Sequence, residues 1–292
     1  NFKIFMKKKL VYFCQSILIY LFFIIAKIIG LKLSRYIFSG IFIKLGSLFK
    51  SKKTILNNLD KINPSLNTSE KEEIIKKMWS NYGKTFAEYV YLKMFKKQTS
   101  HITIKNLEIL NQILKENKPV IFISGHFANY ELMSMELVRA KIKLATIYRP
   151  LNNLFLNPFM EYLRKKFVCK NQIKKGLSGV KESLKYMENN YSIALMVDQR
   201  VSEGPRVPFF NYNAHTTTLP AQLSNRFNSK IVPIFISRNT NDHFEMEILE
   251  PLEIPKNTKD NKELIAKKIN ETIEKLILRD PSQWILTHNR WK

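Results

Sequence analysis

Cysteine is scarce in this chain, which has two in 292 residues. Cys14 and Cys169 lie far apart and neither belongs to a CxxC pair, so the sequence excludes a disulfide framework and argues against a zinc knuckle. It also has no glycine-rich phosphate loop and no internal repeat. With 45% hydrophobic residues, the chain is expected to form one large domain plus an appendage, in a reducing compartment.

Acidic residues are also few, because 24 Asp and Glu stand against 48 Lys and Arg, a formal charge of +24. The positive field expected over the surface attracts anionic partners. Nucleic acid, anionic lipid head groups and an acidic protein all satisfy this condition. A genome rich in A and T, which favours lysine, is an alternative source of the charge that needs no function.

The N-terminal segment carries no charge from Leu10 to Ala26 and follows three lysines, 7 to 9. Its length predicts a transmembrane helix. A cleaved signal peptide fits less well, because the small-x-small cleavage site is missing and the apolar run exceeds roughly 7–15 residues. A buried core helix is the other alternative. Positive charge on both sides gives no orientation. Since the chain begins with Asn1, we expect the natural start upstream or at Met6.

Apolar residues then recur with helical spacing among basic ones. The apolar set is Ile37, Phe38, Ile41, Phe42, Leu45, Leu48 and Phe49, and the basic set is Arg35, Lys44, Lys50, Lys52 and Lys53. This pattern is typical of a helix in the membrane interface, and equally of a helix packed on a domain. We divide the chain into a basic segment with an anchor helix (1–31), a basic amphipathic interfacial segment (32–62) and a main domain (63–292).

The main domain alternates helical stretches with short β-rich runs. It opens with a helix whose predicted N-cap is Thr68 or Ser69 and closes with a packing helix at residues 259–278. The predicted strands are 119–124, 143–147, 192–197, 230–237 and 244–249. This alternation predicts an α/β fold, with a sheet flanked by helices.

Polar residues follow four of these strands. They are His126, then Arg149, then Asp198 with Gln199 and Arg200, and then Arg238. In open α/β sheets, ligands bind beyond the carboxyl ends of the strands. The four strand exits are therefore expected to converge on one site, although a solvated rim of loops would have the same composition.

The motif GHFANYE, residues 125–131, directly follows the strand 119–124. In one regular helix, His126 and Glu131 would point about 140° apart. If His126 lies in a turn that Gly125 permits, and Glu131 in the first helical turn, the carboxylate can reach the imidazole. It would fix the tautomer and leave the other ring nitrogen free to take a proton, which makes His126 a general base. A chance pair, with a Glu attracted to a helix N-terminus, is the alternative.

No serine or cysteine stands in a G-x-S-x-G elbow, so the base is expected to activate a substrate hydroxyl, with direct transfer and no covalent enzyme intermediate. His126, His215, His243 and His288 lack HExxH spacing, which argues against a metal site. We expect neither a metal nor a cofactor.

Six segments, in order, resemble the late acyltransferases of lipid A biosynthesis, the lauroyl/myristoyl acyltransferase family. That family belongs to a wider lysophospholipid acyltransferase-like group with an H-x4-D/E motif. The segments are GHFANYE, YRP (148–150), VDQR (197–200), VPFF (207–210), TTTLPAQLSNR (216–226) and QWILTHNRWK (283–292). The resemblance covers nearly the entire chain and departs at Tyr130, where the family often has Trp. It implies a central mixed β-sheet flanked by helices, of glycerolipid acyltransferase type, behind an N-terminal transmembrane or interfacial helix.

The resemblance implies transfer of a fatty acyl group from acyl carrier protein to a hydroxyl of a lipid A precursor. The location would be the bacterial inner membrane, with the catalytic domain facing the cytoplasm and no nucleic acid as partner. His126 would deprotonate the acceptor and Glu131 would orient His126. An acidic carrier protein and an anionic glycolipid acceptor both fit the basic surface.

Candidate substrate contacts are arginines, because the planar guanidinium binds phosphate and carboxylate bidentately. They are Arg149, Arg200 and Arg206, with an ordinary surface cation as the alternative for each. Asn129 is a further candidate contact, and Asp198 is expected to position Arg149 or a sugar hydroxyl. Residues 207–210 either line an acyl channel or belong to the core. We assign no catalytic role to the C-terminal residues Trp284, His288, Arg290 and Trp291.

Two other functions fit the residues. The first is an acyltransferase acting on a glycerophospholipid or another glycolipid, with acyl-CoA or acyl carrier protein as donor. The second is a non-catalytic, membrane-tethered module that binds nucleic acid or anionic lipid through charge. The second predicts that replacing His126 or Glu131 leaves function intact.

Overall fold

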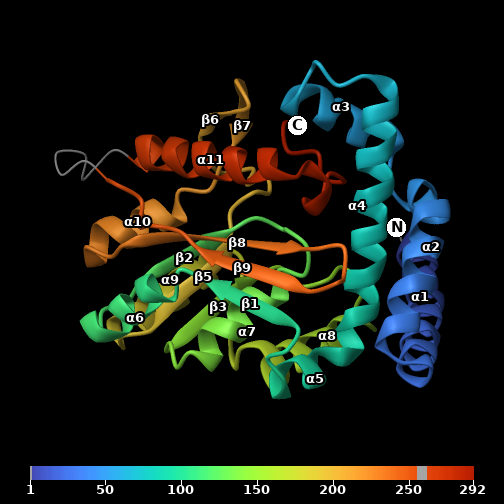
Figure 1. The fold of residues 1–292 in the computed structure, drawn as a ribbon, viewed down its shortest axis with the longest axis horizontal. Coiled ribbons are helices and arrows are strands. Elements are labelled where there is room, and N and C mark those ends of the chain that lie inside the picture. Colours follow the sequence, from blue (N-terminus) through green and yellow to red (C-terminus); the bar gives the residue numbers. More distant parts are fainter. Residues whose placement is uncertain (1, 255–261) are drawn as a thin grey trace.

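A seven-stranded mixed β-sheet forms the centre of the chain in a computed structural model that describes residues 2–254 and 262–292 (Figure 1). Its strands are β1 (Ile102–Lys105), β2 (Ile121–Ser124), β3 (Leu144–Tyr148), β4 (Asn171–Lys174), β5 (Ser192–Met196), β8 (Ile231–Arg238) and β9 (Phe244–Ile248). Their spatial order is β1-β9-β8-β2-β5-β3-β4. Only the β8–β9 pair is antiparallel within this sheet of described strands. The expected mixed α/β fold is confirmed, and all five predicted strands are present.

Helices cover both faces of the sheet. Successive side chains of a strand point to opposite faces, so strands with apolar residues at successive positions need a cover on each face. In β2, Phe122 packs into one core, whereas Ile121 and Ile123 pack into the other. The first core is closed by α5 (Leu92–Lys97), α6 (Leu107–Glu116), α7 (Glu131–Arg139) and α8 (Asn157–Leu163). The second is closed by α9 (Leu177–Glu188), α10 (Leu219–Phe227), α11 (Lys262–Arg279) and the hairpin of β6 (Arg206–Phe209) and β7 (Tyr212–His215). Of the predicted helix 259–278, residues 259–261 lie outside the described residues.

Four helices precede the sheet and stand beside it (Figure 1). They are α1 (Phe2–Ile29), α2 (Leu31–Phe49), α3 (Lys52–Ile62) and α4 (Thr68–Glu88), followed by the short 3-10 helix η1 (Tyr89–Tyr91). The N-cap of α4 is Asn67, which forms a capping box with Glu70. The prediction of Thr68 or Ser69 was therefore wrong, since Oδ1 of Asn67 accepts from the Glu70 N–H at 3.0 Å and the Glu70 side chain accepts from the Asn67 N–H at 2.7 Å.

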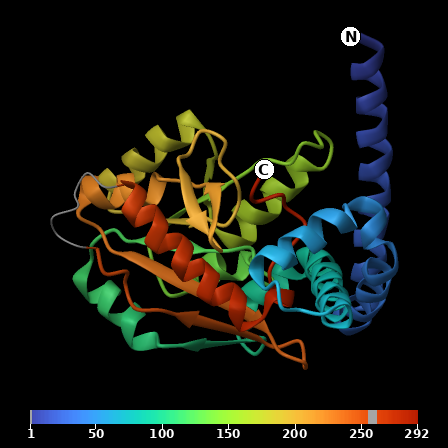
Figure 2. The ribbon, with the colours of Figure 1, turned by 90° about the horizontal axis from the view of Figure 1, so that it is seen from above.

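The N-terminal half of α1 projects beyond the rest of the molecule (Figure 2). Within the whole of α1, Met6–Ile29 is long and apolar enough to cross a membrane, and its most apolar window is only 17% buried. Exposed apolar side chains include Leu10 and Ile28. Because most of this surface is uncovered, α1 is not a core helix, and its composition is that of a membrane-spanning segment.

The next helix, α2, packs closely on α4. A Cβ atom on Gly83 of α4 would lie 2.3 Å from the backbone oxygen of Phe38, and one on Gly46 of α2 would lie 2.3 Å from the Trp79 ring. Other apolar side chains of α2 stay exposed, with Tyr36 at 78%. The helix therefore combines a packed face with an exposed apolar one. The side chain of Phe49 lies outside the described part of the chain.

Candidate active site

The GHFANYE segment forms a tight turn between β2 and α7. A Cβ on Gly125 would lie 2.6 Å from the Phe127 ring, so only glycine fits there. Ala128 adopts a left-handed conformation, with φ of 43°, which is unfavourable for alanine. The C-terminal segment holds the turn, because the Ala128 N–H donates to the Gln283 carbonyl at 2.8 Å and the Ile285 N–H donates to the His126 carbonyl at 3.2 Å.

His126 is paired with Asp198 across neighbouring strands. Its Nδ1 lies 2.7 Å from Oδ1 of Asp198, and its backbone N–H donates to Oδ2 at 2.9 Å. Strands β2 and β5 are parallel neighbours, so the residues that follow them emerge at the same edge of the sheet. Convergence of the strand exits is thus confirmed for His126 and Asp198, with Asp198 bound to the imidazole instead of to Arg149.

Asp198 is buried, at 3% exposure, and saturated with donors. Trp284 Nε1 donates to Oδ2 at 2.7 Å, beside the backbone N–H of His126. Burial by itself raises the pKa of Asp198, but the charge and hydrogen bonds of His126, with that of Trp284, outweigh burial and hold the pKa well below its usual range. Because an ionised carboxylate only accepts hydrogen bonds, Nδ1 of His126 is the donor of this pair. Nε2, which lies 3.3 Å from the Gln199 side chain, is then the ring nitrogen that can act as a base.

A second histidine stands next to this pair. The ring centroids of His126 and His288 are 6.2 Å apart, and the Gln199 side chain lies between them, 3.3 Å from Nε2 of His126 and 2.9 Å from Nε2 of His288. Burial, followed by the nearby His126, lowers the pKa of His288 to about 4. His288 is therefore neutral at physiological pH and places no positive charge beside the His126 ring.

Glu131 does not contact His126 in this structure. Among the described residues, its Oε1 accepts hydrogen bonds from Tyr89 at 2.9 Å and from Nε of Arg164 at 2.8 Å. It begins α7, whereas the turn residue Tyr130 places its ring 4.7 Å from the His126 ring. Burial and then the Glu131 charge raise the pKa of Tyr130 to about 12. The predicted His126–Glu131 contact is therefore not observed, because the turn directs the carboxylate toward Arg164.

A cavity of about 220 Å³ adjoins the turn. Of its lining residues, Tyr130 and Ile285 contact His126, Ala128 belongs to the same turn, and Trp284 contacts Asp198. Its other walls come from α1, α4, η1, α8 and the loop before α8, and they are mostly apolar: Phe23, Met78, Tyr82, Phe86, Tyr89, Leu151, Leu156 and Met160. Asn81, Thr85 and Arg164 add polar groups. The cavity extends from Tyr130 and Trp284, which contact His126 and Asp198, to Phe23 of the apolar N-terminal helix. Such an apolar cavity suits a hydrocarbon chain.

The remaining predicted contacts lie in different surroundings. Asn129 is 2% exposed and donates to Glu88 at 2.8 Å. Arg149 and Arg200 are exposed where they follow β3 and β5. Arg206 is exposed on β6, where its Nε donates weakly to His215 at 3.4 Å. Of residues 207–210, Phe209 and Phe210 belong to the second core. The Phe209 ring lies 6.3 Å from that of Trp284, which lines the cavity, but none of the four residues lines it.

Sequence reasoning gave no role at this site to Trp284, His288, Tyr89 and Arg164. Trp284 contacts Asp198, His288 contacts Gln199, and Tyr89 and Arg164 fix Glu131. Gln199 was expected at the strand exits, and it lies between the two histidines. Asp198 was found, with a different partner. The signal available for it was its position after a strand adjacent to β2. The described residues contain no cluster of three or more His, Cys, Asp or Glu side chains that could hold a metal ion.

Comparisons with known proteins find one family model and relatives of the same kind. The family model described as bacterial lipid A biosynthesis acyltransferase matches residues 3–292. The chain is 25% identical over 243 residues to lipid A biosynthesis acyltransferase 2 of Shigella flexneri, which covers 81% of this chain and 76% of that protein. It is 23% identical over 247 residues to lipid A biosynthesis myristoyltransferase of Escherichia coli (strain K12), covering 81% of this chain and 74% of that protein.

Proposed function

Since this chain belongs to the bacterial lipid A biosynthesis acyltransferase family and is therefore an acyltransferase with a lipid acceptor, we propose that His126 is its general base and that Asp198 orients it. The observation that carries the proposal is the 2.7 Å contact between Nδ1 of His126 and Oδ1 of Asp198. This contact occupies Nδ1, so Nε2 is the ring nitrogen that can act as the base. The ring of Tyr130, which lines an apolar cavity, lies 4.7 Å from the His126 ring.

In the proposed reaction, Nε2 of His126 takes the proton of an acceptor hydroxyl while the hydroxyl oxygen attacks the carbonyl carbon of an acyl thioester. The carbon–sulfur bond then breaks, and the thiolate leaves with the proton that His126 has carried. Asp198 stabilises the imidazolium that forms between these steps. The products are an ester and a free thiol, and no covalent bond to the enzyme is needed.

We assign the cavity to the acyl chain of the donor. Tyr130 and Trp284, which line it, contact the catalytic pair directly. Phe23 brings a wall from α1, the helix with the composition of a membrane span. An acyl chain delivered to this cavity would therefore lie beside the bilayer that holds the acceptor.

The basic surface supports an acidic donor and an anionic acceptor. With a formal charge of +24, the chain attracts an acyl carrier protein, and exposed guanidinium groups at Arg149 and Arg200 suit phosphates of a lipid A precursor. Because acyl carrier proteins are cytoplasmic, we propose that the catalytic domain faces the cytoplasm at the inner membrane. Glu131 is proposed to hold Arg164, a fixed positive charge, in the cavity wall.

The test is acyl transfer by the purified full-length protein in nanodiscs that contain a lipid A precursor. Acyl carrier protein and CoA thioesters of the same chain length are compared as donors, and mass spectrometry measures the acylated product. We expect transfer from the carrier-protein thioester, with loss of at least about 10³-fold in His126→Ala, because the base is removed.

The matched control is His215→Ala, which removes a histidine from the β6–β7 hairpin. We expect that variant to keep wild-type turnover. Wild-type turnover in His126→Ala would contradict the proposal. Transfer to a glycerophospholipid, with none to the lipid A precursor, would assign a different acceptor to the same chemistry.

A further inference from the structure

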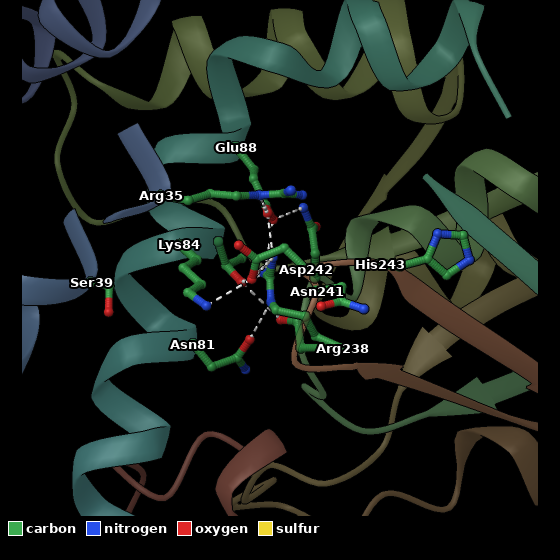
Figure 3. A network of polar contacts seen from close by, with 12 residues as sticks. Arg35, Ser39, Asn81, Lys84, Glu88, Arg238, Asn241, Asp242 and His243 are labelled. Carbon is green, nitrogen blue, oxygen red and sulfur yellow. Dashed lines mark hydrogen bonds and ion pairs between the residues drawn. The ribbon is translucent and has the colours of Figure 1, made fainter. Parts of the chain in front are cut away.

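A buried carboxylate on α4, Glu88, connects three separate parts of the chain (Figure 3). Arg35 of α2 donates from Nε to its Oε1 at 2.6 Å. Arg238, at the end of β8, binds both carboxylate oxygens, with Nη2 at 2.9 Å from Oε2. Asn129 of the catalytic turn donates from Nδ2 to Oε2 at 2.8 Å. Glu88 itself has no exposed surface.

Burial tends to raise the pKa of Glu88, but Arg238, then Arg35 and Asn129, outweigh burial and lower it. The carboxylate is therefore ionised between two guanidinium groups. A buried ion pair of this kind is a poor source of stability, because the desolvation of the charges offsets much of their attraction. Its geometry is nonetheless fixed, since each oxygen of Glu88 has two donors and bidentate pairing restricts orientation.

The same group of residues holds the strained part of the catalytic turn. Thr85 accepts from Nη2 of Arg238 at 3.1 Å and donates to the carbonyl of Ala128 at 3.2 Å. On the other side of the turn, the Gln283 carbonyl accepts from the Ala128 N–H, and the Gln283 side chain bonds the backbone of Arg238. The left-handed Ala128 is thus clamped on both sides by partners that Arg238 connects, two residues from His126.

The contact between Glu88 and Arg35 connects this group of residues to α2, away from the turn. Arg35 is 9% exposed, and its Nη2 has no hydrogen-bond partner among the described residues. Glu88 therefore provides its hydrogen-bonded anchor, and the guanidinium also lies over the rings of Phe95 and Phe244 at 5.9 and 5.7 Å. The neighbouring Tyr36 is 78% exposed, and α2 continues with exposed Leu45 and Leu48. A shift of α2 along α4 would pull on Arg35, and through Glu88 on Asn129.

We propose that Glu88 is a positioning residue of the acyl-transfer site, and that through Arg35 it couples the seating of α2 to the geometry of the His126 turn. This proposal rests on the proposed function, since it takes His126 as the base. Glu88 touches no substrate in this account. It acts by keeping Asn129 and Ala128, and hence the imidazole between β2 and α7, at a fixed position.

The test compares Glu88→Gln, Arg35→Met and Arg35→Lys with wild type in the nanodisc transfer assay. Small displacements of a catalytic group lower turnover strongly while substrate binding persists. We expect Glu88→Gln and Arg35→Met to lower kcat about tenfold or more with an unchanged KM for the acceptor. Arg35→Lys should recover part of the loss. The double variant should be no worse than the more severe single one, because both changes break the same connection.

Asp60→Asn is the matched control. Asp60 of α3 pairs with Lys71 of α4 at 2.7 Å, and this ion pair involves none of the residues that surround Glu88. We expect wild-type kcat from this variant, and effects that add to those of Arg35→Met when the two are combined.

Asn129→Ala covers the case in which both Glu88→Gln and Arg35→Met fail to fold. It removes only the contact with the turn and leaves Glu88 bound to both arginines. A folded Asn129→Ala protein with kcat lowered about tenfold supports the proposal. Wild-type kcat in Asn129→Ala, or in folded Glu88→Gln and Arg35→Met, overturns it. His126→Ala is assayed alongside these variants. If His126→Ala is inactive while the Glu88, Arg35 and Asn129 variants are fully active, the positioning role of Glu88 is wrong but the proposed function stands. If His126→Ala is active, the proposed function itself is wrong.

Discussion

The assignment of Asp198 as the partner of His126 predicts a specific outcome for Asp198→Asn. In the wild-type protein, Oδ2 accepts from two fixed N–H donors, the His126 backbone at 2.9 Å and Trp284 Nε1 at 2.7 Å. An asparagine in the same place would turn its amide oxygen toward those donors, because an NH2 group there would face two N–H groups. Its NH2 would then face Nδ1 of His126 at the position of Oδ1, 2.7 Å away.

An NH2 donor at that position forces Nδ1 to act as acceptor, so the proton of the neutral imidazole moves to Nε2. The base is then protonated on the nitrogen that must accept the substrate proton. The same chemical change in a serine-protease triad lowers turnover about 10⁴-fold, and we expect a loss of about 10³–10⁴-fold in kcat here. KM should change little, because Asp198 touches no substrate.

Single-turnover acyl transfer, monitored by mass spectrometry, measures this loss independently of product release. Glu131→Gln is the comparison, because it removes the carboxylate charge at the spacing first expected to orient His126, while Gln can still accept from Tyr89 and Arg164. We expect Glu131→Gln to lose much less activity than Asp198→Asn. The reverse order, with an active Asp198→Asn enzyme and an inactive Glu131→Gln enzyme, would refute the pairing argued here.

Three further perturbations test packing, charge and the cavity. Gly83→Ala is expected to lower the free energy of unfolding by about 1–3 kcal/mol, because its Cβ would lie 2.3 Å from the backbone oxygen of Phe38. Gly40→Ala on α2, where a Cβ meets open space, should be neutral or stabilising. Equal denaturation midpoints for the two variants would contradict the packing of α2 on α4. Burial lowers the pKa of His101 to about 4, so the wild-type protein loses stability as pH falls from about 6.5, the unfolded value, toward 4. His101→Phe should remove that loss and flatten the stability profile in this window, and an unchanged slope in chemical denaturation would show that the imidazole is not the cause. Phe23→Ala should enlarge the cavity and shift donor preference toward longer acyl chains by about fourfold per added methylene, as read from competing thioesters; an unchanged preference would place the acyl chain elsewhere.

The fold was largely predictable from the sequence because its central strands are short apolar runs. β2, β3, β5, β8 and β9 all lie in segments that hydrophobic pattern and β-branched residues indicate. β1 and β4 were missed, because they sit at the two edges of the sheet and their residues, such as Thr103 and Gln172, are as polar as those of loops. Edge strands have one partner and less burial, so their sequences carry a weaker signal.

The candidate site was predictable in its base and only partly in its partners. His126 stands out because a histidine directly after a buried strand is conspicuous. Its pairing with Asp198 depends on which strand lies beside β2, and strand order is set by the packing of the whole sheet. The direction of Glu131 depends on the left-handed conformation of Ala128. An alanine in the sequence gives no indication of that conformation. The Glu88 network unites α2, α4, β8 and the turn, which are distant in sequence, so no local pattern reveals it.

The most direct test of the central claim is the mass of lipid A from cells that carry wild-type protein, His126→Ala or no protein. The account predicts that lipid A from His126→Ala cells lacks one secondary acyl chain, as in cells without the protein, although the variant reaches the membrane in normal amounts. The assignment of His126 as the base would be contradicted if lipid A is fully acylated in the His126→Ala cells but lacks an acyl chain in cells without the protein.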